Sequence, residues 1–160
     1  MATTVAGVVV ARGNGAARAI ANTPGTTVEL AGTNPVTEKH VDLASFRGKP
    51  AVLNVWSSWC TECNAEAGAL ERFARMHPNA RVIGVDVQDT RSDAEAFYRR
   101  WRWRHPSVAD PQGDLAARLA VVGMPTTFFL NGRHEIVSSI VGATDLAGFN
   151  HGLRLALERN

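Results

Sequence analysis

Residues 52–63 read Val52-Leu53-Asn54-Val55-Trp56-Ser57-Ser58-Trp59-Cys60-Thr61-Glu62-Cys63, and this stretch decides the fold. Residues 51–56 form an apolar run that only Asn54 interrupts. Its length and β-branched content predict a strand that is buried on both faces of an α/β sheet. Residues 61–76 then carry apolar side chains at helical spacing, and Pro78 ends the pattern. Cys60 therefore stands where a buried strand has ended and a helix begins.

The two cysteines of the chain, Cys60 and Cys63, are separated by two residues. A disulfide between them closes too short a loop to stabilise the chain much. Zinc would need a second such pair or suitably spaced histidines, and the five histidines are scattered. Covalent haem would need a histidine after the second cysteine, where Asn64 stands. The pattern favours redox chemistry, while two reduced cysteines placed by chance remain the alternative.

The predicted position of Cys60 explains how it would react. The backbone N–H groups and the positive dipole end of a helix start stabilise a thiolate, which is the attacking form of cysteine. Cys63, one turn further, is close enough to attack a mixed disulfide that forms on Cys60. The expected reaction is thiol–disulfide exchange, in which the Cys60–Cys63 disulfide forms as a substrate is reduced, or the reverse.

The composition is that of an ordinary globular domain. The chain has 160 residues, 45% of them hydrophobic and 20% charged, with a formal net charge of +2. This charge is too small to imply nucleic acid or an anionic membrane as a partner. The run Arg99–Arg104, with tryptophans at 101 and 103, could stack on nucleic-acid bases, but one short basic run is too small a surface to indicate nucleic-acid binding. We expect no nucleic-acid partner and no membrane span, since no apolar run approaches about 20 residues.

The rest of the chain predicts one mixed sheet with helices on both faces and a β-hairpin before it. We expect a partly ordered arm over 1–25, in which 8–11 could add an edge strand, and one domain over 26–160. Ser92 and Glu95 form a capping box that predicts a helix ending near Trp101. The other expected strands are 27–30, 40–43, 81–87, 126–130 and 135–141, and the other expected helices are 115–120 and 144–158.

Residues 52–63 resemble the redox-site segment of the thioredoxin superfamily, in its extracytoplasmic TlpA/ResA-like branch. The segments LASFRGKP (43–50), 82–86, 101–110 and 123–130 are also similar, so the resemblance covers about residues 26–158. It implies a thioredoxin-like fold and a protein-disulfide reductase of the cytochrome c maturation type, with protein substrates and an upstream redox partner. It also implies an extracytoplasmic location with a leader or anchor outside this sequence. The N-terminus lacks a secretory pattern, so a cytoplasmic location stays open.

The resemblance also assigns roles to single residues. It implies that Pro125 is cis and lies against the cysteine pair, whereas the sequence alone favours a trans proline that starts an edge strand. It implies that the backbone of Met124 pairs with the substrate. Glu66 would exchange protons with Cys63, and the alternative is a solvated first-turn glutamate. We expect Trp59 to pack beside the disulfide and limit access to it.

The two residues between the cysteines, Thr61 and Glu62, are expected to tune the redox couple. The charge of Glu62 should oppose thiolate formation on Cys60, so we expect the pKa of Cys60 to be only moderately lowered. We expect a monomer that needs no cofactor and no metal. Two other functions stay open: a thiol peroxidase, although residues 57–60 lack the Pro, Thr and Cys pattern of peroxiredoxins, and a binding or chaperone module that does not use the cysteines.

Overall fold

A five-stranded sheet forms the centre of the computed structural model, which describes residues 23–160. The strands lie in the order β5-β4-β3-β6-β7, with β3, β4 and β5 parallel and with β6 and β7 antiparallel to their neighbours. Their bounds are β3 Ala51–Trp56, β4 Arg81–Val87, β5 Ser107–Asp110, β6 Thr126–Leu130 and β7 Ile136–Val141. The carboxyl ends of the three parallel strands therefore meet at one edge of the sheet.

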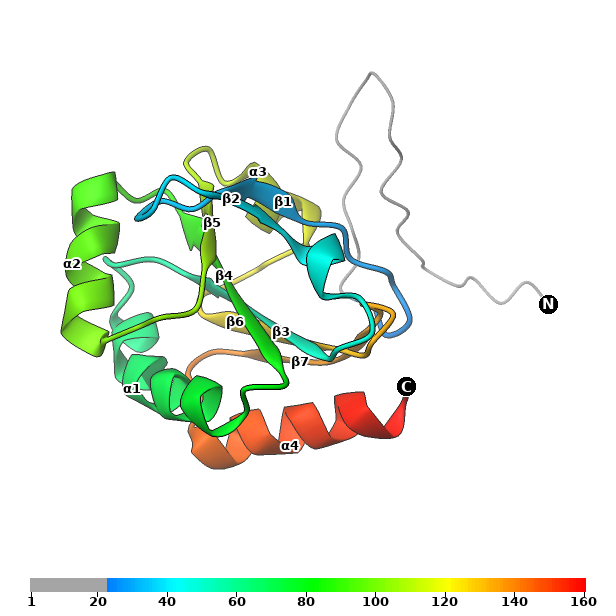
Figure 1. The fold of residues 1–160 in the computed structure, drawn as a ribbon. Helices are drawn as coiled ribbons and strands as arrows, with labels where there is room; N and C mark the ends of the chain where they lie inside the picture. Colours follow the sequence, from blue (N-terminus) through cyan, green and yellow to red (C-terminus); the bar gives the residue numbers. More distant parts are fainter. Residues whose placement is uncertain (1–22) are drawn as a thin grey trace, which may run out of the picture.

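Both faces of this sheet are covered (Figure 1). Helices α1, α2 and α4 pack with one side of the sheet around one hydrophobic cluster, and α3 and the N-terminal hairpin pack around the other. The bounds are α1 Thr61–Met76, α2 Arg91–Trp101, α3 Asp114–Arg118 and α4 Leu146–Glu158, and the hairpin is β1 Ala31–Thr33 with β2 His40–Asp42, followed by a 3-10 turn over Leu43–Phe46. The predicted fold class, a thioredoxin-like mixed sheet between helices with a hairpin before it, is confirmed.

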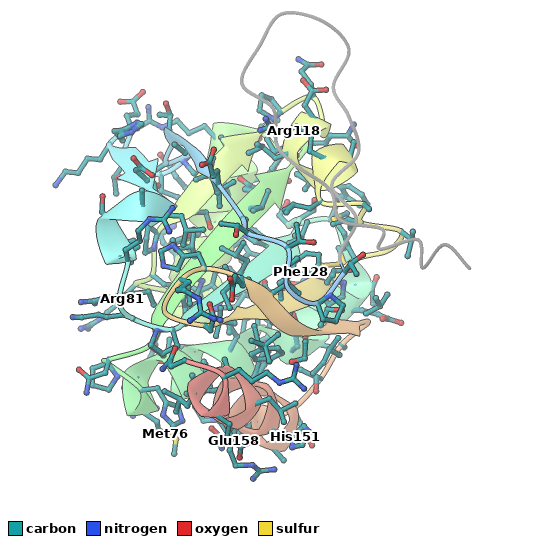
Figure 2. The ribbon with its side chains drawn as sticks, turned by 90° about the vertical axis from the view of Figure 1, so that its right-hand side faces the viewer. Met76, Arg81, Arg118, Phe128, His151 and Glu158 are labelled. Carbon is teal, nitrogen blue, oxygen red and sulfur yellow. A yellow bond between two sulfur atoms is a disulfide. The ribbon has the colours of Figure 1, made fainter. Side chains whose placement is uncertain are left out.

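The central strands are buried on both faces, as their sequences predict. All six residues of β3 are buried, and its side chains alternate between the two clusters: Val52 and Trp56 lie on the α1 side, Leu53 and Val55 on the hairpin side. Figure 2 shows Phe128 of β6 in the middle of the molecule and Met76 at its outer edge. Two buried faces require this continuous apolar pattern, which is why β3 and α1 were predicted with the bounds that the structure has.

Two local predictions were wrong. The first strand lies at Ala31–Thr33 and not at 27–30, where Val28 is buried but its backbone N–H donates to His134 O instead of pairing in the hairpin. Helix α2 is capped by Thr90, whose side chain accepts from Asp93 N. Ser92 is the second residue of α2 and not its N-cap, so the capping box expected between Ser92 and Glu95 does not form; the Glu95 carboxylate pairs with Arg91.

Strand β5 was missing from the predicted order because four residues give too short a pattern to recognise. The short helix α3 also begins and ends earlier than the predicted 115–120. Most of the expected arm, including its possible strand at 8–11, lies outside the described residues. The last residue of that expected arm, Gly25, donates its N–H to Ile136 O on β7. Within residues 23–160, no helix is long and apolar enough to cross a membrane.

Candidate active site

Cys60 and Cys63 are joined by a disulfide at the start of α1. Cys60 is the N-cap residue, and its Sγ accepts a hydrogen bond from Cys63 N at 3.1 Å. The helix start therefore places a backbone N–H at the sulfur that would carry the thiolate charge. Cys60 is 8% exposed and Cys63 only 1%. Exchange requires access to the attacking sulfur, and Cys60 is the more exposed of the two cysteines; the roles of Cys60 in attack and of Cys63 in resolution stay predictions.

The Met124–Pro125 peptide bond is cis and lies close to the turn after β3. The strand register explains this position. Thr126, the residue after Pro125, pairs with Val55 in the antiparallel β3–β6 pair, so Pro125 lies beside the last residue of β3. The Sδ atom of Met124 lies 3.9 Å from Ser57 Oγ. The carbonyl of Pro125 accepts from a backbone N–H at position 142, 2.8 Å away. The cis bond agrees with what the resemblance implies, while the pairing of Met124 with a substrate stays a prediction.

Glu66 is buried in the structure, only 2% exposed, so the solvated alternative is wrong. Its Oε1 accepts from Asn54 Nδ2 at 2.8 Å, and its Oε2 accepts from Thr144 N at 3.0 Å. Burial raises the pKa of Glu66 to about 7, against the lowering effect of these two donors. Glu66 lies three residues after Cys63 on α1, so the two side chains share one face of the helix.

Asn54 and Thr144 also contact Glu66, and neither was predicted as a site residue. Asn54 is the one polar residue in the buried run of β3, and its Nδ2 also donates to Thr127 Oγ1 at 3.0 Å. A buried polar side chain needs partners, so its position in the sequence was a usable signal. Thr144 contributes only its backbone N–H, from the segment between β7 and α4. Because any residue but proline can supply a backbone N–H, a contact between segments 78 residues apart cannot be recognised from the sequence.

The outer residues of the predicted site are exposed. Glu62 accepts from Ala143 N at 3.4 Å and so lies against the chain after β7. Thr61 is the first residue of α1. Trp59 is 59% exposed, and its Nε1 donates to Gln88 O at 3.2 Å. The tuning roles of Thr61 and Glu62, and the shielding of the disulfide by Trp59, stay predictions.

A second group of carboxyls, Asp86, Asp89 and Asp110, was not predicted. Asp86 ends up at this edge because it is paired with Trp56 at the last register position of β3 and β4. It is 3% exposed, and its Oδ1 has no hydrogen-bond partner. Burial, the side chain of Asp89 and the charge of Asp110 raise the pKa of Asp86 to about 9. Asp110 itself accepts from the backbone N–H groups of residues 115 and 116 at the start of α3.

The tryptophans of the basic run pack against α1. Trp103 is buried and its Nε1 donates to Ala67 O at 3.0 Å, while Trp101 Nε1 donates to Asn64 Oδ1 at 3.2 Å. Their indole N–H groups are therefore used inside the protein, which argues against a base-stacking role. Among residues 23–160, no group of three or more His, Cys, Asp or Glu side chains is arranged to hold a metal ion.

Comparisons with known proteins agree with this site. The chain is 38% identical over 115 residues to a thiol:disulfide interchange protein DsbE of Xylella fastidiosa, which covers 71% of this chain and 56% of that relative. It is 30% identical over 101 residues to the sporulation thiol-disulfide oxidoreductase A of Bacillus subtilis, covering 60% of this chain and 61% of the relative. The chain thus spans little more than half the length of the curated relatives it matches.

Solved structures show the same fold. A secreted thiol-disulfide isomerase from Corynebacterium glutamicum superposes with a TM-score of 0.74 at 25% identity, over 82% of this chain and 85% of that one. A secreted disulfide oxidoreductase of Mycobacterium tuberculosis gives 0.70 at 24% identity, over 78% and 94% of the two chains. The family model described as AhpC/TSA matches residues 23–139, most of the domain that the structure describes. The chain therefore belongs to the AhpC/TSA family, within the thioredoxin superfamily.

Proposed function

We propose that this protein is a thiol–disulfide oxidoreductase that reduces disulfides in protein substrates through Cys60 and Cys63. The observation that carries the proposal is the disulfide at the N-terminus of α1, in which Cys60 keeps 8% exposure and Cys63 only 1%. A staple for stability would gain little from so short a loop. The names of the DsbE and sporulation relatives, which are oxidoreductases of this kind, support the same activity.

The reaction starts from the reduced protein. The Cys60 thiolate attacks one sulfur of the substrate disulfide, and the other substrate sulfur leaves as a thiolate that takes up a proton. Cys63 then loses its proton and attacks Cys60 Sγ in the mixed disulfide. This step forms the 60–63 disulfide and releases the second substrate thiol, so the protein dithiol is oxidised by two electrons as the substrate disulfide is reduced. An upstream dithiol partner must then reduce the pair again.

Glu66 is the proposed acceptor of the Cys63 proton. A group with a pKa of about 7 both takes up and releases protons at neutral pH, which general acid–base catalysis requires. Glu66 and Cys63 share a face of α1, and the two donors on the Glu66 carboxylate fix its orientation. Direct transfer or transfer through one water would serve equally well.

The substrate would bind across the cis-proline. An extended substrate segment can pair with the backbone of Met124, next to Pro125, which brings its cysteine toward Cys60. The exposed indole of Trp59 adds an apolar contact beside Cys60. Relatives include a soluble secreted antigen from Mycobacterium bovis, 33% identical over 88 residues. We infer an extracytoplasmic location, and apocytochromes c as a substrate class.

The reduction potential of the Cys60–Cys63 couple tests this function. The protein is equilibrated against glutathione or dithiothreitol and followed by tryptophan fluorescence, with Cys60→Ser as the control. A value near about −270 mV supports a reductase, and one near about −120 mV an oxidase of secreted proteins. The absence of a reversible couple would contradict the proposal. Consumption of hydrogen peroxide as fast as thiol exchange would instead favour a thiol peroxidase.

A further inference from the structure

The turn that leads into Cys60 is fixed by one carboxylate. Ser58 donates twice to Asp89: its backbone N–H to Oδ2 at 2.7 Å and its hydroxyl to Oδ1 at 2.5 Å. Hydrogen bonds to a carboxylate are stronger than those between neutral groups, and a pair of them also fixes orientation. Asp89 therefore sets the backbone of Ser58, two residues before the reactive cysteine.

The residues on either side of Ser58 are held by the same loop after β4. Ser57 Oγ donates to the backbone carbonyl of Val87, and Trp59 Nε1 donates to that of Gln88 at 3.2 Å. Three consecutive residues of one turn are thus attached to three consecutive residues of the other. Of the four acceptors in this set, two are backbone carbonyls and two are the carboxylate oxygens of Asp89. A substitution at Asp89 can therefore release the turn without changing the path of the backbone acceptors.

Asp86, on β4, is buried next to Asp89. The side chain of Asp89 and the charge of Asp110, at the end of β5, act on Asp86. Burial raises the pKa of Tyr98 on α2, and Asp86 adds to this rise. Burial and the carboxylates of Asp89 and Asp110 raise the pKa of Asp86 to about 9. Asp86 therefore carries its proton at neutral pH, and a protonated carboxyl has an O–H group that can donate to a neighbouring carboxylate.

We propose that Asp89 is a positioning residue for Cys60, and that Asp86, buried beside it, supports the Asp89 carboxylate in its contact with Ser58. The pair exchanges neither electrons nor a proton with the substrate, so its effect on exchange is geometric. Because the pair fixes the backbone of Ser58, it also fixes the orientation of the Cys60 side chain two residues later. The proposal rests on the proposed function for its kinetic readout, but its structural part can be measured separately.

The proposal predicts a pH dependence. Above about pH 9 Asp86 loses its proton, and its charge then faces Asp89 and Asp110, which weakens the hold on Ser58. The rate of attack per Cys60 thiolate should fall several-fold between pH 8 and pH 10. In Asp86→Asn the amide keeps a donor and gains no charge, so this fall should be absent. A fall of equal size in Asp86→Asn would overturn the role of Asp86.

The decisive variant is Asp89→Asn, with Asp93→Asn as the matched control. Asp93 is exposed, lies four residues further on and bonds with Thr90, so its variant also loses one negative charge near the start of α2. We expect the rate constant for attack of the reduced protein on glutathione disulfide to fall about tenfold in Asp89→Asn relative to the control, at matched Cys60 thiolate fraction. We also expect amide hydrogen exchange at Ser58 to become at least tenfold faster.

The outcomes separate the two proposals. If the wild-type protein shows no thiol exchange at all, the proposed function fails, and hydrogen exchange at Ser58 still decides whether Asp89 holds the turn. If the wild type is active and Asp89→Asn stays within twofold of Asp93→Asn in rate, the positioning role is wrong. Unchanged protection of the Ser58 amide in a folded Asp89→Asn protein would contradict it as well.

Discussion

Two buried carboxyls flank the redox site, and their surroundings differ. Glu66, on α1, has a donor for each oxygen, Asn54 Nδ2 and Thr144 N. Asp86, on β4, has one oxygen without a partner, and its neighbours are two other carboxyls. Burial raises the pKa of both, to about 7 for Glu66 and about 9 for Asp86.

The difference shows that burial alone does not decide what a carboxyl can do. Donors that favour the charged form bring the pKa of Glu66 back to neutral pH, where it can exchange protons with Cys63. The carboxylates around Asp86 act in the opposite direction, so Asp86 keeps its proton. One acid is suited to catalysis and the other to holding structure, although the two side chains are equally buried.

The largest effect should come from Glu66→Gln. The amide keeps the size of the side chain but accepts no proton, so the resolving attack of Cys63 loses its base. We expect the rate of mixed-disulfide resolution to fall about 100-fold, the lower end for general base catalysis. Stopped-flow fluorescence with a peptide disulfide measures this rate.

The matched control is Glu71→Gln, because Glu71 lies on the same helix and forms a surface ion pair with Arg75. The wild-type rate should rise with pH through about 7, as Glu66 loses its proton, and this limb should be absent from Glu66→Gln. If the rate of Glu66→Gln still rises with pH near 7, this rise belongs to another titrating group.

Asp86→Asn should stabilise the protein at high pH. In the wild type the folded chain keeps the Asp86 proton up to about pH 9, whereas the unfolded chain loses it near the ordinary value of 3.8. The folded state binds more protons between these values, so the free energy of unfolding falls as pH rises. The amide removes this loss, and we expect a gain of about 2 kcal/mol at pH 8 that shrinks toward pH 4.

Urea unfolding at pH 4, 6 and 8 measures this gain, with Asp93→Asn as the control for loss of one charge. A gain that is equal at pH 4 and pH 8 would show that Asp86 is not the group with the raised pKa. Asp86→Asn and Glu66→Gln then differ in kind, since the first acts mainly on stability and the second on rate.

The sequence was sufficient for the elements that bury both faces or one clear stripe. Strand β3, helix α1 and strands β4 and β6 have the predicted bounds because their apolar patterns are long and regular. Strand β1 was misplaced because a three-residue strand is defined by its partner, β2, and not by its own pattern. The same holds for β5, whose four residues gained their place from pairing with β4.

The chemistry of the site divides in the same way. The cysteine pair follows from local spacing, and the cis-proline from the family resemblance. The protonation of Glu66 and Asp86 could not be predicted, because it depends on burial and on contacts between distant segments. Thr144, for example, reaches Glu66 from 78 positions further along the chain.

Asn54→Leu should shift the proton chemistry of Glu66. The substitution keeps a side chain of similar size on β3 but removes the donor to Glu66 Oε1. Since that bond favours the charged form, its loss should raise the pKa of Glu66 further, and the rate limb near pH 7 should move up by about one pH unit. Thr127→Val is the control, because it removes the other partner of Asn54 and leaves the bond to Glu66 in place. A limb that moves equally in both variants would point to a repacked core.

The smallest effect should come from Trp59→Phe, on the Asp89 side of the site. Trp59 is largely exposed, and its bond to Gln88 O is one of several that hold the turn. Exposed hydrogen bonds contribute little, so we expect the free energy of unfolding to change by less than about 1 kcal/mol. The fluorescence difference between the oxidised and reduced forms should fall strongly, because Trp59 adjoins Cys60 while the indole of Trp56 is buried in the core. If the fluorescence difference persists in Trp59→Phe, its source is a tryptophan in the core. Reduction of the disulfide would then change the structure beyond the turn that Asp89 holds.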